Sequence, residues 1–132
     1  MKTASNSIID TLKERGYRIT APRRAIVEAL VTASTPKTVK EIGVHTKIKD
    51  LSTVYRTLGE LVKESLAEEF TDKGTSYFEL GGHHHDHAVC TGCGAIAHVP
   101  CSETKIPASL KKAGWVVETH EALWRGRCKA CV

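Results

Sequence analysis

Cysteine placement constrains this 132-residue chain more than any other feature of its sequence. Two C-x2-C pairs, Cys90/Cys93 and Cys128/Cys131, are separated by 34 residues. Each pair can bind one ion from a tight turn, and two pairs supply the tetrahedral four-thiolate shell typical of structural zinc. Disulfides are the alternative, but the first residues contain no secretory signal. We therefore expect a cytoplasmic chain, in which paired cysteines favour metal or redox roles.

Charge, cysteine and histidine are unevenly distributed along the chain. Residues 1–63 carry 12 Lys/Arg against 6 Asp/Glu, whereas all five cysteines and six of the seven histidines follow residue 82. Aromatic residues make up only 5% of the chain, so a small C-terminal half would have a thin apolar core. Bound zinc can contribute on the order of 10 kcal/mol to such a module. We predict two domains, 1–80 and 83–132, joined by a hinge at 81–82.

Helical periodicity dominates the N-terminal part. It predicts helices over 5–16, from Thr20 with Pro22 in the first turn, after Thr38, and over 50–65. Two segments that flank Lys73-Gly74 then predict a hairpin with a two-residue turn. This order is typical of a winged helix-turn-helix, in which the exposed face of the third or fourth helix enters the major groove of DNA. A solvated face on a helical bundle is the alternative.

Several side chains of this part suit DNA contacts. The polar face of helix 50–65 carries Ser52, Tyr55 and Arg56, whose hydroxyl and guanidinium groups can donate to phosphates and base edges. Arg18 and Arg23, near the second helix, belong to the cluster of cations that phosphate contacts need.

Histidines gather directly before the first cysteine pair. In an extended strand, alternate side chains point to opposite faces, so His85 and His87 would share one face while His84 and Asp86 share the other. One strand can thus supply two separate half-sites of nitrogen and oxygen donors. Imidazole with carboxylate suits iron(II), zinc(II), manganese(II) or cobalt(II), and geometry selects among them.

Beyond the cysteine pair, the pattern predicts a small α/β domain. We expect strands around 88–89 and 96–99, a helix near 103–113, and a last strand from Trp115 to about Leu123. His98 and His120 would lie on these elements. The overall fold class is therefore α+β. The longest apolar runs are a few residues, well short of the ~20 that span a membrane, so we expect no membrane partner.

Together, these motifs resemble the ferric uptake regulator superfamily of bacterial metal-responsive repressors. The resemblance runs in family order from about residue 8 to the C-terminus. The matching segments are Arg18-Ile-Thr20-Ala-Pro22-Arg23, Ser52-Thr53-Val-Tyr55-Arg56-Thr-Leu58, Tyr77-Phe-Glu79-Leu, His84-His-Asp-His87-x2-Cys90-x2-Cys93 and Gly126-x-Cys128-x2-Cys131.

The resemblance implies roles for individual residues. The four paired cysteines would form the structural zinc shell, and a sensory site at the hinge would use Glu79, His85, His87 and His98. A further site in the dimerisation domain would use His84, Asp86 and His120, with Glu103 at the helix position although Lys105 aligns better there. The residues that contact DNA would be Arg18, Arg23, Ser52, Thr53, Tyr55 and Arg56. Arg18 would enter an A·T-rich minor groove, and Tyr55 and Arg56 would meet thymine methyls and phosphates.

Four positions depart from the family pattern. Lys37 stands near a position where many members supply a sensory histidine, and His98 replaces a common carboxylate. Ser65 replaces a common glycine after the recognition helix. Cys101 is additional, and we interpret it as a small buried hydrophobic residue, with a sensory or redox thiol as the alternative.

These observations predict a homodimeric, metal-dependent transcriptional repressor that binds A·T-rich inverted repeats of double-stranded DNA and controls metal-homeostasis genes. It would hold structural zinc and sense a second divalent metal, iron(II) or zinc(II), with manganese(II) as an option, at a site between the domains. A peroxide- or manganese-sensing member of the same family is the alternative, followed by a zinc-buffering protein. We predict no enzymatic activity, because Asp86 interrupts the histidine pattern of a metallohydrolase and no nucleophile has an obvious paired base.

Overall fold

The structure is a computed structural model that describes the chain except for residues 1, 82–84 and 102–105. It divides into two compact units, Met1–Gly82 and His83–Val132. Within the described residues, no helix is both long enough and apolar enough to cross a membrane.

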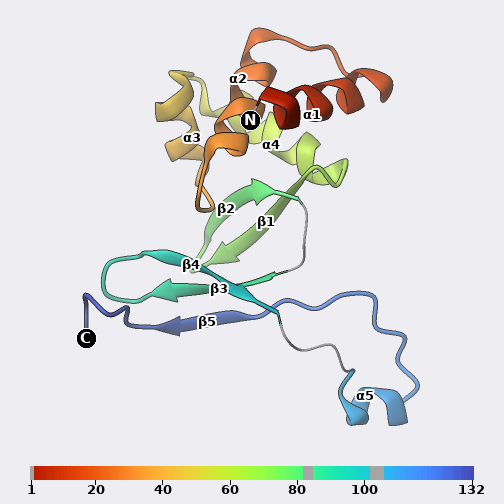
Figure 1. The fold of residues 1–132 in the computed structure, drawn as a ribbon, viewed down its shortest axis with the longest axis vertical. Coiled ribbons are helices and arrows are strands. Elements are labelled where there is room, and N and C mark those ends of the chain that lie inside the picture. The colour runs from red at the N-terminus through yellow and green to blue at the C-terminus, as the bar shows by residue number, and fades with distance from the viewer. Residues whose placement is uncertain (1, 82–84, 102–105) are drawn as a thin grey trace. The chain divides into compact units, whose positions relative to one another are not determined.

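The N-terminal unit begins with four helices, each started by a recognisable sequence signal except the first. They are α1 (Lys2–Glu14), α2 (Ala21–Thr32), α3 (Val39–Thr46) and α4 (Leu51–Lys63) (Figure 1). Thr20 caps α2 by accepting from the Arg23 N–H, and Asp50 caps α4. Thr38 and Glu41 form a reciprocal capping box at the start of α3. The predicted starts of these three helices are therefore confirmed.

Helices α3 and α4 pack closely at the start of α4. Gly43 on α3 faces Leu51 at the start of α4, and a Cβ at position 43 would lie only 2.7 Å from the Leu51 Cδ2 atom. Lys47 ends α3 in the left-handed conformation, with φ of 61°. A short turn connects α3 to α4, and the two helices form the predicted helix-turn-helix.

An antiparallel hairpin follows the helices. Strands β1 (Ala67–Asp72) and β2 (Thr75–Leu80) pair with Glu68 opposite Glu79. Lys73 and Gly74 both have positive φ, as a type I′ turn requires, so the predicted two-residue hairpin turn is confirmed.

The hairpin is tied to the helices through the loop before α3. Backbone hydrogen bonds join Lys37 and Phe78 in both directions, at 2.8 and 2.7 Å. Phe78 is also part of the apolar core of this unit. The core members that are buried are Ile9, Leu12, Ile26, Val27, Ala29, Leu30, Ile42, Val54, Leu58, Leu61, Ala67 and Phe78. The strand that carries Glu79 is therefore anchored on the helical core.

The C-terminal unit is built on a three-stranded sheet. Its strands β3 (His85–Cys90), β4 (Ile96–Pro100) and β5 (Leu123–Gly126) are arranged in the order β4-β3-β5 (Figure 1). β3 pairs with β4 antiparallel and with β5 parallel, placing His87 opposite His98 and Cys90 opposite Gly126. A short helix, α5 (Ala108–Lys112), lies between β4 and β5 in the chain.

Two predictions for this unit need correction. The last strand begins at Leu123, not at Trp115, and residues 115–122 form no helix or strand. The β-branched and aromatic residues at 115–117 suggested a strand, but β4 and β5 already occupy both edges of β3, and Val116 is 88% exposed. The helix expected near 103–113 spans only Ala108–Lys112 among the described residues, since Pro107 stands directly before it.

Candidate metal centres and nucleic-acid interface

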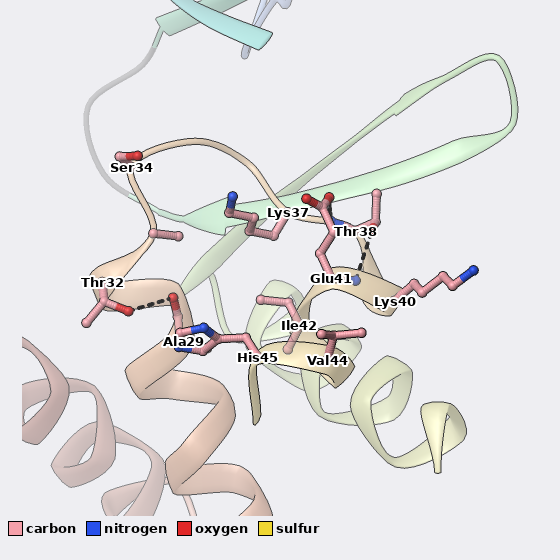
Figure 2. A pocket seen from close by; sticks show the side chains of 11 residues that line it. Ala29, Thr32, Ser34, Lys37, Thr38, Lys40, Glu41, Ile42, Val44 and His45 are labelled. Atoms are coloured by element: carbon pink, nitrogen blue, oxygen red, sulfur yellow. Dashed lines mark hydrogen bonds between the residues drawn. The ribbon is translucent and has the colours of Figure 1, made fainter. Parts of the chain in front are cut away.

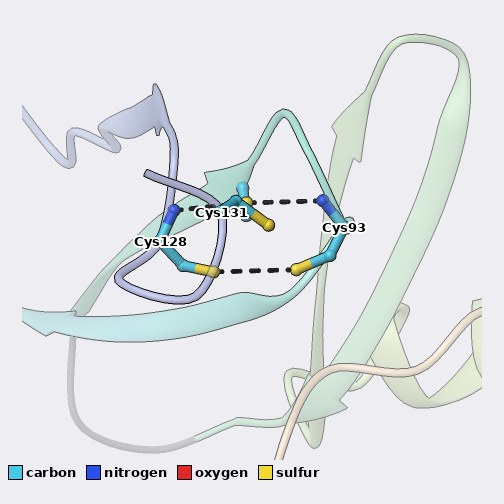
Figure 3. A group of neighbouring side chains, drawn as sticks. Cys93, Cys128 and Cys131 are labelled. Carbon is cyan, nitrogen blue, oxygen red and sulfur yellow. Dashed lines mark hydrogen bonds between the residues drawn. The ribbon is translucent and has the colours of Figure 1, made fainter.

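Four thiols converge in the C-terminal unit. One sulfur each from Cys90, Cys93, Cys128 and Cys131 lies within 4.8 Å of the others. The Cys93 and Cys128 sulfurs face each other at 3.8 Å (Figure 3). A disulfide would need about 2.05 Å. By contrast, Zn–S bonds of about 2.3 Å at tetrahedral angles separate two sulfurs by about 3.8 Å, so this spacing fits zinc.

The strand pairing of β3 brings the two cysteine pairs together. Cys90 ends β3 and pairs in register with Gly126 on β5, two residues before Cys128. Gly92, in the turn between Cys90 and Cys93, is packed so closely that a Cβ there would lie 3.0 Å from the Cys131 sulfur. A glycine therefore suits this position, because any side chain would force Cys131 to shift as the two turns approach one another.

Backbone N–H groups stabilise the ionised form of one cysteine in the cluster. The Cys90 sulfur accepts N–H bonds from Gly92, Cys93 and Cys128 at 3.3–3.4 Å. These donors, with Cys128 contributing most, lower the pKa of Cys90 to about 5. The neighbouring sulfurs, Cys128 first, raise the pKa of Cys131 to about 12, because closely spaced thiols resist full ionisation. A divalent cation reverses this effect by stabilising every thiolate.

Three imidazoles form a second cluster on one face of the same sheet. His85, His87 and His98 have ring centroids 4.3–5.4 Å apart, and each can place a nitrogen within 4.8 Å of the other two. The pairing of His87 with His98 explains the cluster, because directly opposed residues of an antiparallel pair lie on the same face. The alternation expected for His85 and His87 is thus realised, and His98 joins them from β4.

Glu79 belongs to the N-terminal unit. It lies on β2 and is 7% exposed. Its neighbour Phe78 forms backbone hydrogen bonds with Lys37, so the loop of Lys37 lies beside the strand that carries Glu79. Within this unit the sequence-predicted carboxylate and the loop of Lys37 are therefore adjacent.

A third group of donors combines residues that the sequence did not associate. Asp86, Cys101 and His120 each place one donor atom within 4.8 Å of the others. The Cys101 sulfur lies 3.2 Å from His120 Nε2. Of the ligands expected for a further site, Asp86 and His120 do come together, whereas His84 and Glu103 lie outside the described residues. Cys101 is half-buried among donors, so its interpretation as a buried hydrophobic residue is wrong.

On the N-terminal unit, α4 presents an exposed polar face. Tyr55 is 59% exposed and Arg56 is also exposed. The Asp50 carboxylate caps the helix by accepting a hydrogen bond from the Ser52 N–H. The hydroxyls of Ser52 and Thr53 also donate to it, and these bonds, Ser52 first, lower the pKa of Asp50. Two of the six expected DNA contacts therefore also have a structural role at the start of α4.

The two expected arginine contacts outside α4 differ in their surroundings. Arg18 is exposed, and its carbonyl accepts a hydrogen bond from the Arg23 guanidinium. Arg23 also pairs with Glu60 on α4, at 2.6 and 3.0 Å, and stacks over the Tyr17 ring. Arg23 thus holds α2 against α4, a structural role that sequence reasoning missed.

A pocket of 680 Å³ opens between the end of α2, the following loop and α3 (Figure 2). Its polar lining includes Lys37, Lys40, Glu41 and His45. Glu41 is committed to the capping box with Thr38. His45, interpreted from sequence as a lone surface residue, is exposed and belongs to none of the three donor clusters found among the described residues.

A winged helix-turn-helix in the same chain as thiol and imidazole clusters defines a class, that of metal-responsive DNA-binding regulators. The ferric uptake regulator family model matches residues 14–123. The chain belongs to this family, whose members are metal-responsive transcriptional regulators.

Individual relatives cover nearly the whole chain. The Bacillus subtilis peroxide operon regulator is 32% identical over 93% of this chain and 90% of its own length. The Bordetella parapertussis ferric uptake regulation protein is 31% identical over 91% and 93%, respectively. The structure of the Helicobacter pylori ferric uptake regulator, described as revealing three functional metal binding sites, aligns with a TM-score of 0.75 at 26% identity. That alignment covers 96% of this chain and 93% of the other.

Proposed function

We propose that this chain is a repressor whose affinity for DNA is set by a divalent metal bound between its two domains. Residues 1–80 bind DNA, 81–82 act as the hinge, and 83–132 bind metal and dimerise. The observation that carries the proposal is the convergence of His85, His87 and His98, beginning at the third residue of the C-terminal unit. Such a regulator acts on the chromosome, in the cytoplasm.

Two metal sites have different tasks in this proposal. The four cysteines hold a zinc ion that stabilises the C-terminal unit, since a closed four-thiolate shell leaves no open position for chemistry. The three histidines, together with Glu79, hold the sensed ion. The carboxylate on β2 supports this assignment because an oxygen donor beside imidazole nitrogens suits iron(II), zinc(II) and manganese(II).

The coupling follows from the position of the ligands in the chain. An ion bound by residues of both units stabilises only the orientation that brings them together. In a homodimer this orientation sets the distance between two copies of α4, which must match half-sites a whole number of helical turns apart. A coupling free energy of about 1–3 kcal/mol would change operator affinity about 5–150-fold.

The DNA contacts follow from the exposed residues of the N-terminal unit. Tyr55 and Arg56 on α4 meet base edges and phosphates of the major groove, and Ser52 adds a contact at the start of the helix. Exposed Arg18 enters the A·T-rich minor groove of an inverted repeat. Arg23 and Thr53 support this surface through their bonds to Glu60 and Asp50.

The test measures metal-dependent binding of the full-length protein to duplexes carrying A·T-rich inverted repeats, at fixed salt, with iron(II), zinc(II) or manganese(II). His98→Ala and Glu79→Ala should lose most of the metal-induced gain in affinity. His98 is exposed, so its replacement tests the site with little risk to the fold. Arg56→Ala is the matched control: it should weaken DNA binding while metal binding stays intact.

A full metal response in both His98→Ala and Glu79→Ala would contradict the sensory role. The same titration identifies the ion. If metal binds but none of the three ions changes operator affinity in the wild type, the chain buffers metal instead of sensing it.

A peroxide-sensing role is the second candidate, favoured by the 32% identity to the Bacillus subtilis peroxide operon regulator. It would require iron(II) in the sensory site, with imidazole oxidation as the signal. Lys37, which stands near the position of a common family histidine, argues against it. Release of the iron(II)-loaded protein from DNA by hydrogen peroxide, absent with manganese(II), would favour the peroxide role.

A further inference from the structure

A cysteine outside the four-thiol cluster lies among metal-binding side chains. Asp86 is on β3, Cys101 directly follows β4, and His120 belongs to the segment before β5. Segments well separated in sequence therefore bring a carboxylate, a thiol and an imidazole to one place. Their donor atoms all lie within 4.8 Å of one another.

Strand register separates this group from the three histidines. His87 opposes His98 on one face of the β3–β4 pair, and Asp86 opposes Val99 on the other. Cys101 is two residues beyond Val99, the spacing that returns a side chain to the same face. The group of Asp86, Cys101 and His120 is thus distinct from the proposed sensory site.

We propose that Cys101 is a ligand of the further site that the family resemblance implies for Asp86 and His120, and that its thiolate makes this a mixed thiolate, carboxylate and imidazole site for zinc(II). Zn–S of about 2.3 Å and Zn–N of about 2.0–2.1 Å at a tetrahedral angle place sulfur and nitrogen about 3.5 Å apart. The Cys101 sulfur and His120 Nε2 are 3.2 Å apart, so a small adjustment suffices to admit the ion.

The surroundings of Asp86 support a ligand role. Asp86 is 8% exposed, and its Oδ1 accepts a hydrogen bond from the Ala122 N–H at 3.2 Å. Such a bond to a backbone group orients a ligating carboxylate. Because Ala122 is two residues after His120, the same bond holds the His120 segment near Asp86.

The thiolate determines which ion this site selects. A donor set of carboxylate and imidazole alone suits iron(II) and manganese(II) as well as zinc(II), whereas thiolate favours zinc(II) over the harder manganese(II). Cys101 therefore makes this site selective for zinc independently of the ion sensed at the histidine cluster. Zinc here would also fasten residues 115–122, which form no helix or strand, to the sheet just before β5.

The competing interpretation is a metal-free pair in which His120 activates the Cys101 thiol. A thiol within hydrogen-bond distance of an imidazole can be a reactive nucleophile. The position of Asp86 favours the metal site. A carboxylate that only orients the imidazole would bond to the ring on the side away from the thiol. Here one Asp86 oxygen lies within 4.8 Å of the Cys101 sulfur as well as of the His120 nitrogen, so all three donors can reach one ion.

Cobalt(II) is a suitable probe, since thiolate ligation produces a charge-transfer absorption that histidine and carboxylate ligands do not. Cobalt(II) is added to full-length protein whose four-cysteine site already holds zinc. The wild type should show this absorption, and Cys101→Ser and Asp86→Asn should lose or strongly reduce it. His98→Ala should retain it, which separates this site from the sensory one. Zinc(II) should displace the cobalt(II) and remove the absorption.

A parallel alkylation experiment uses iodoacetamide, with the modified cysteine identified by peptide mass. Zinc(II) should slow modification of Cys101 at least tenfold in the wild type. Two results overturn the proposal: an absorption unchanged in Cys101→Ser, which reports exchange into the four-cysteine site, or rapid alkylation of Cys101 that zinc(II) does not slow. The second result would identify Cys101 as a reactive thiol. Both measurements are independent of operator binding and so of the sensory role.

Discussion

The two units of this chain are stabilised in different ways. In the N-terminal unit, twelve apolar residues from four helices and a hairpin form a continuous buried cluster. Among the described residues of the C-terminal unit, only Val89 and Cys90 are buried apolar side chains, and Trp115 and Trp124 are 65% and 61% exposed. The comparison indicates that apolar burial stabilises the N-terminal unit, and it predicts that the C-terminal unit depends on zinc bound by its four cysteines.

Among our predictions, removal of the zinc ion from the four-cysteine site should have the largest effect, and it should affect only the C-terminal unit. Zinc contributes on the order of 10 kcal/mol to small metal-dependent domains, more than the apolar burial seen here could replace. We expect Cys90→Ser, or a strong chelator, to unfold residues 83–132 while α1–α4 stay folded. Amide signals in two-dimensional NMR spectra would report the two units separately.

Cys101→Ser is the matched control for this experiment, because it makes the same chemical change outside the four-cysteine shell. It should leave the C-terminal unit folded and its structural zinc bound. A Cys90→Ser protein with native C-terminal signals and full dimerisation would show that the shell is not what stabilises this unit.

A core truncation should produce the second-largest effect, and in the other unit. Leu58 on α4 is completely buried, and replacing such a leucine with alanine costs about 2–5 kcal/mol. Leu58→Ala should lower the unfolding free energy of the N-terminal unit by this amount and leave zinc content unchanged. Chemical denaturation followed by helical circular dichroism measures the loss.

Val44→Ala provides the control for that substitution. Val44 is 75% exposed on α3, so its truncation should change the unfolding free energy by less than about 0.5 kcal/mol. Equal effects of the two substitutions would indicate that the buried cluster does not dominate the stability of this unit.

The same contrast determines what could be predicted from sequence. The caps at Thr20, Thr38 and Asp50 and the turn at Lys73-Gly74 are local signals, and the structure confirms all of them. Each C-x2-C pair is also a local signal. That the two pairs meet in one cluster was predicted from the four ligands that structural zinc requires. Such features are accessible because the residues that determine them are neighbours in the chain.

Long-range pairings were harder to predict. The propensity of residues 115–117 suggested a strand, but propensity does not determine which segment pairs, and β3 pairs with Leu123–Gly126. Cys101 was not associated with Asp86 and His120 because this depends on the β3–β4 register. Once Val99 is known to lie opposite Asp86, the two-residue spacing between Val99 and Cys101 indicates that Cys101 lies on the same face as Asp86. The Arg23–Glu60 pair likewise joins residues 37 positions apart, with no local pattern to reveal it.

The smallest predicted effect concerns an ion pair at the edge of the N-terminal core. The Arg15 guanidinium donates to the Glu64 carboxylate at 2.9 Å, and the Tyr17 hydroxyl donates at 3.1 Å. These bonds, Arg15 first, lower the pKa of Glu64 below its usual range. The lowered pKa means that this contribution to stability is present above the ordinary glutamate pKa and is lost as pH falls through the folded-state value.

Glu64→Gln should therefore lower the unfolding free energy slightly at pH 7 and not at all in strong acid. The difference between wild type and variant should shrink as pH falls below about 4. High salt should also reduce it, because Arg15 is 44% exposed and its charge is screened. Denaturation of the N-terminal unit at several pH values, followed through the helical signal of α1 and α4, measures this. A difference that persists unchanged into strong acid would assign the effect to packing of Glu64 instead of to its charge. The N-terminal unit would then depend on apolar and steric contacts even at its edge, which would sharpen its contrast with the C-terminal unit, for which we expect stabilisation by zinc.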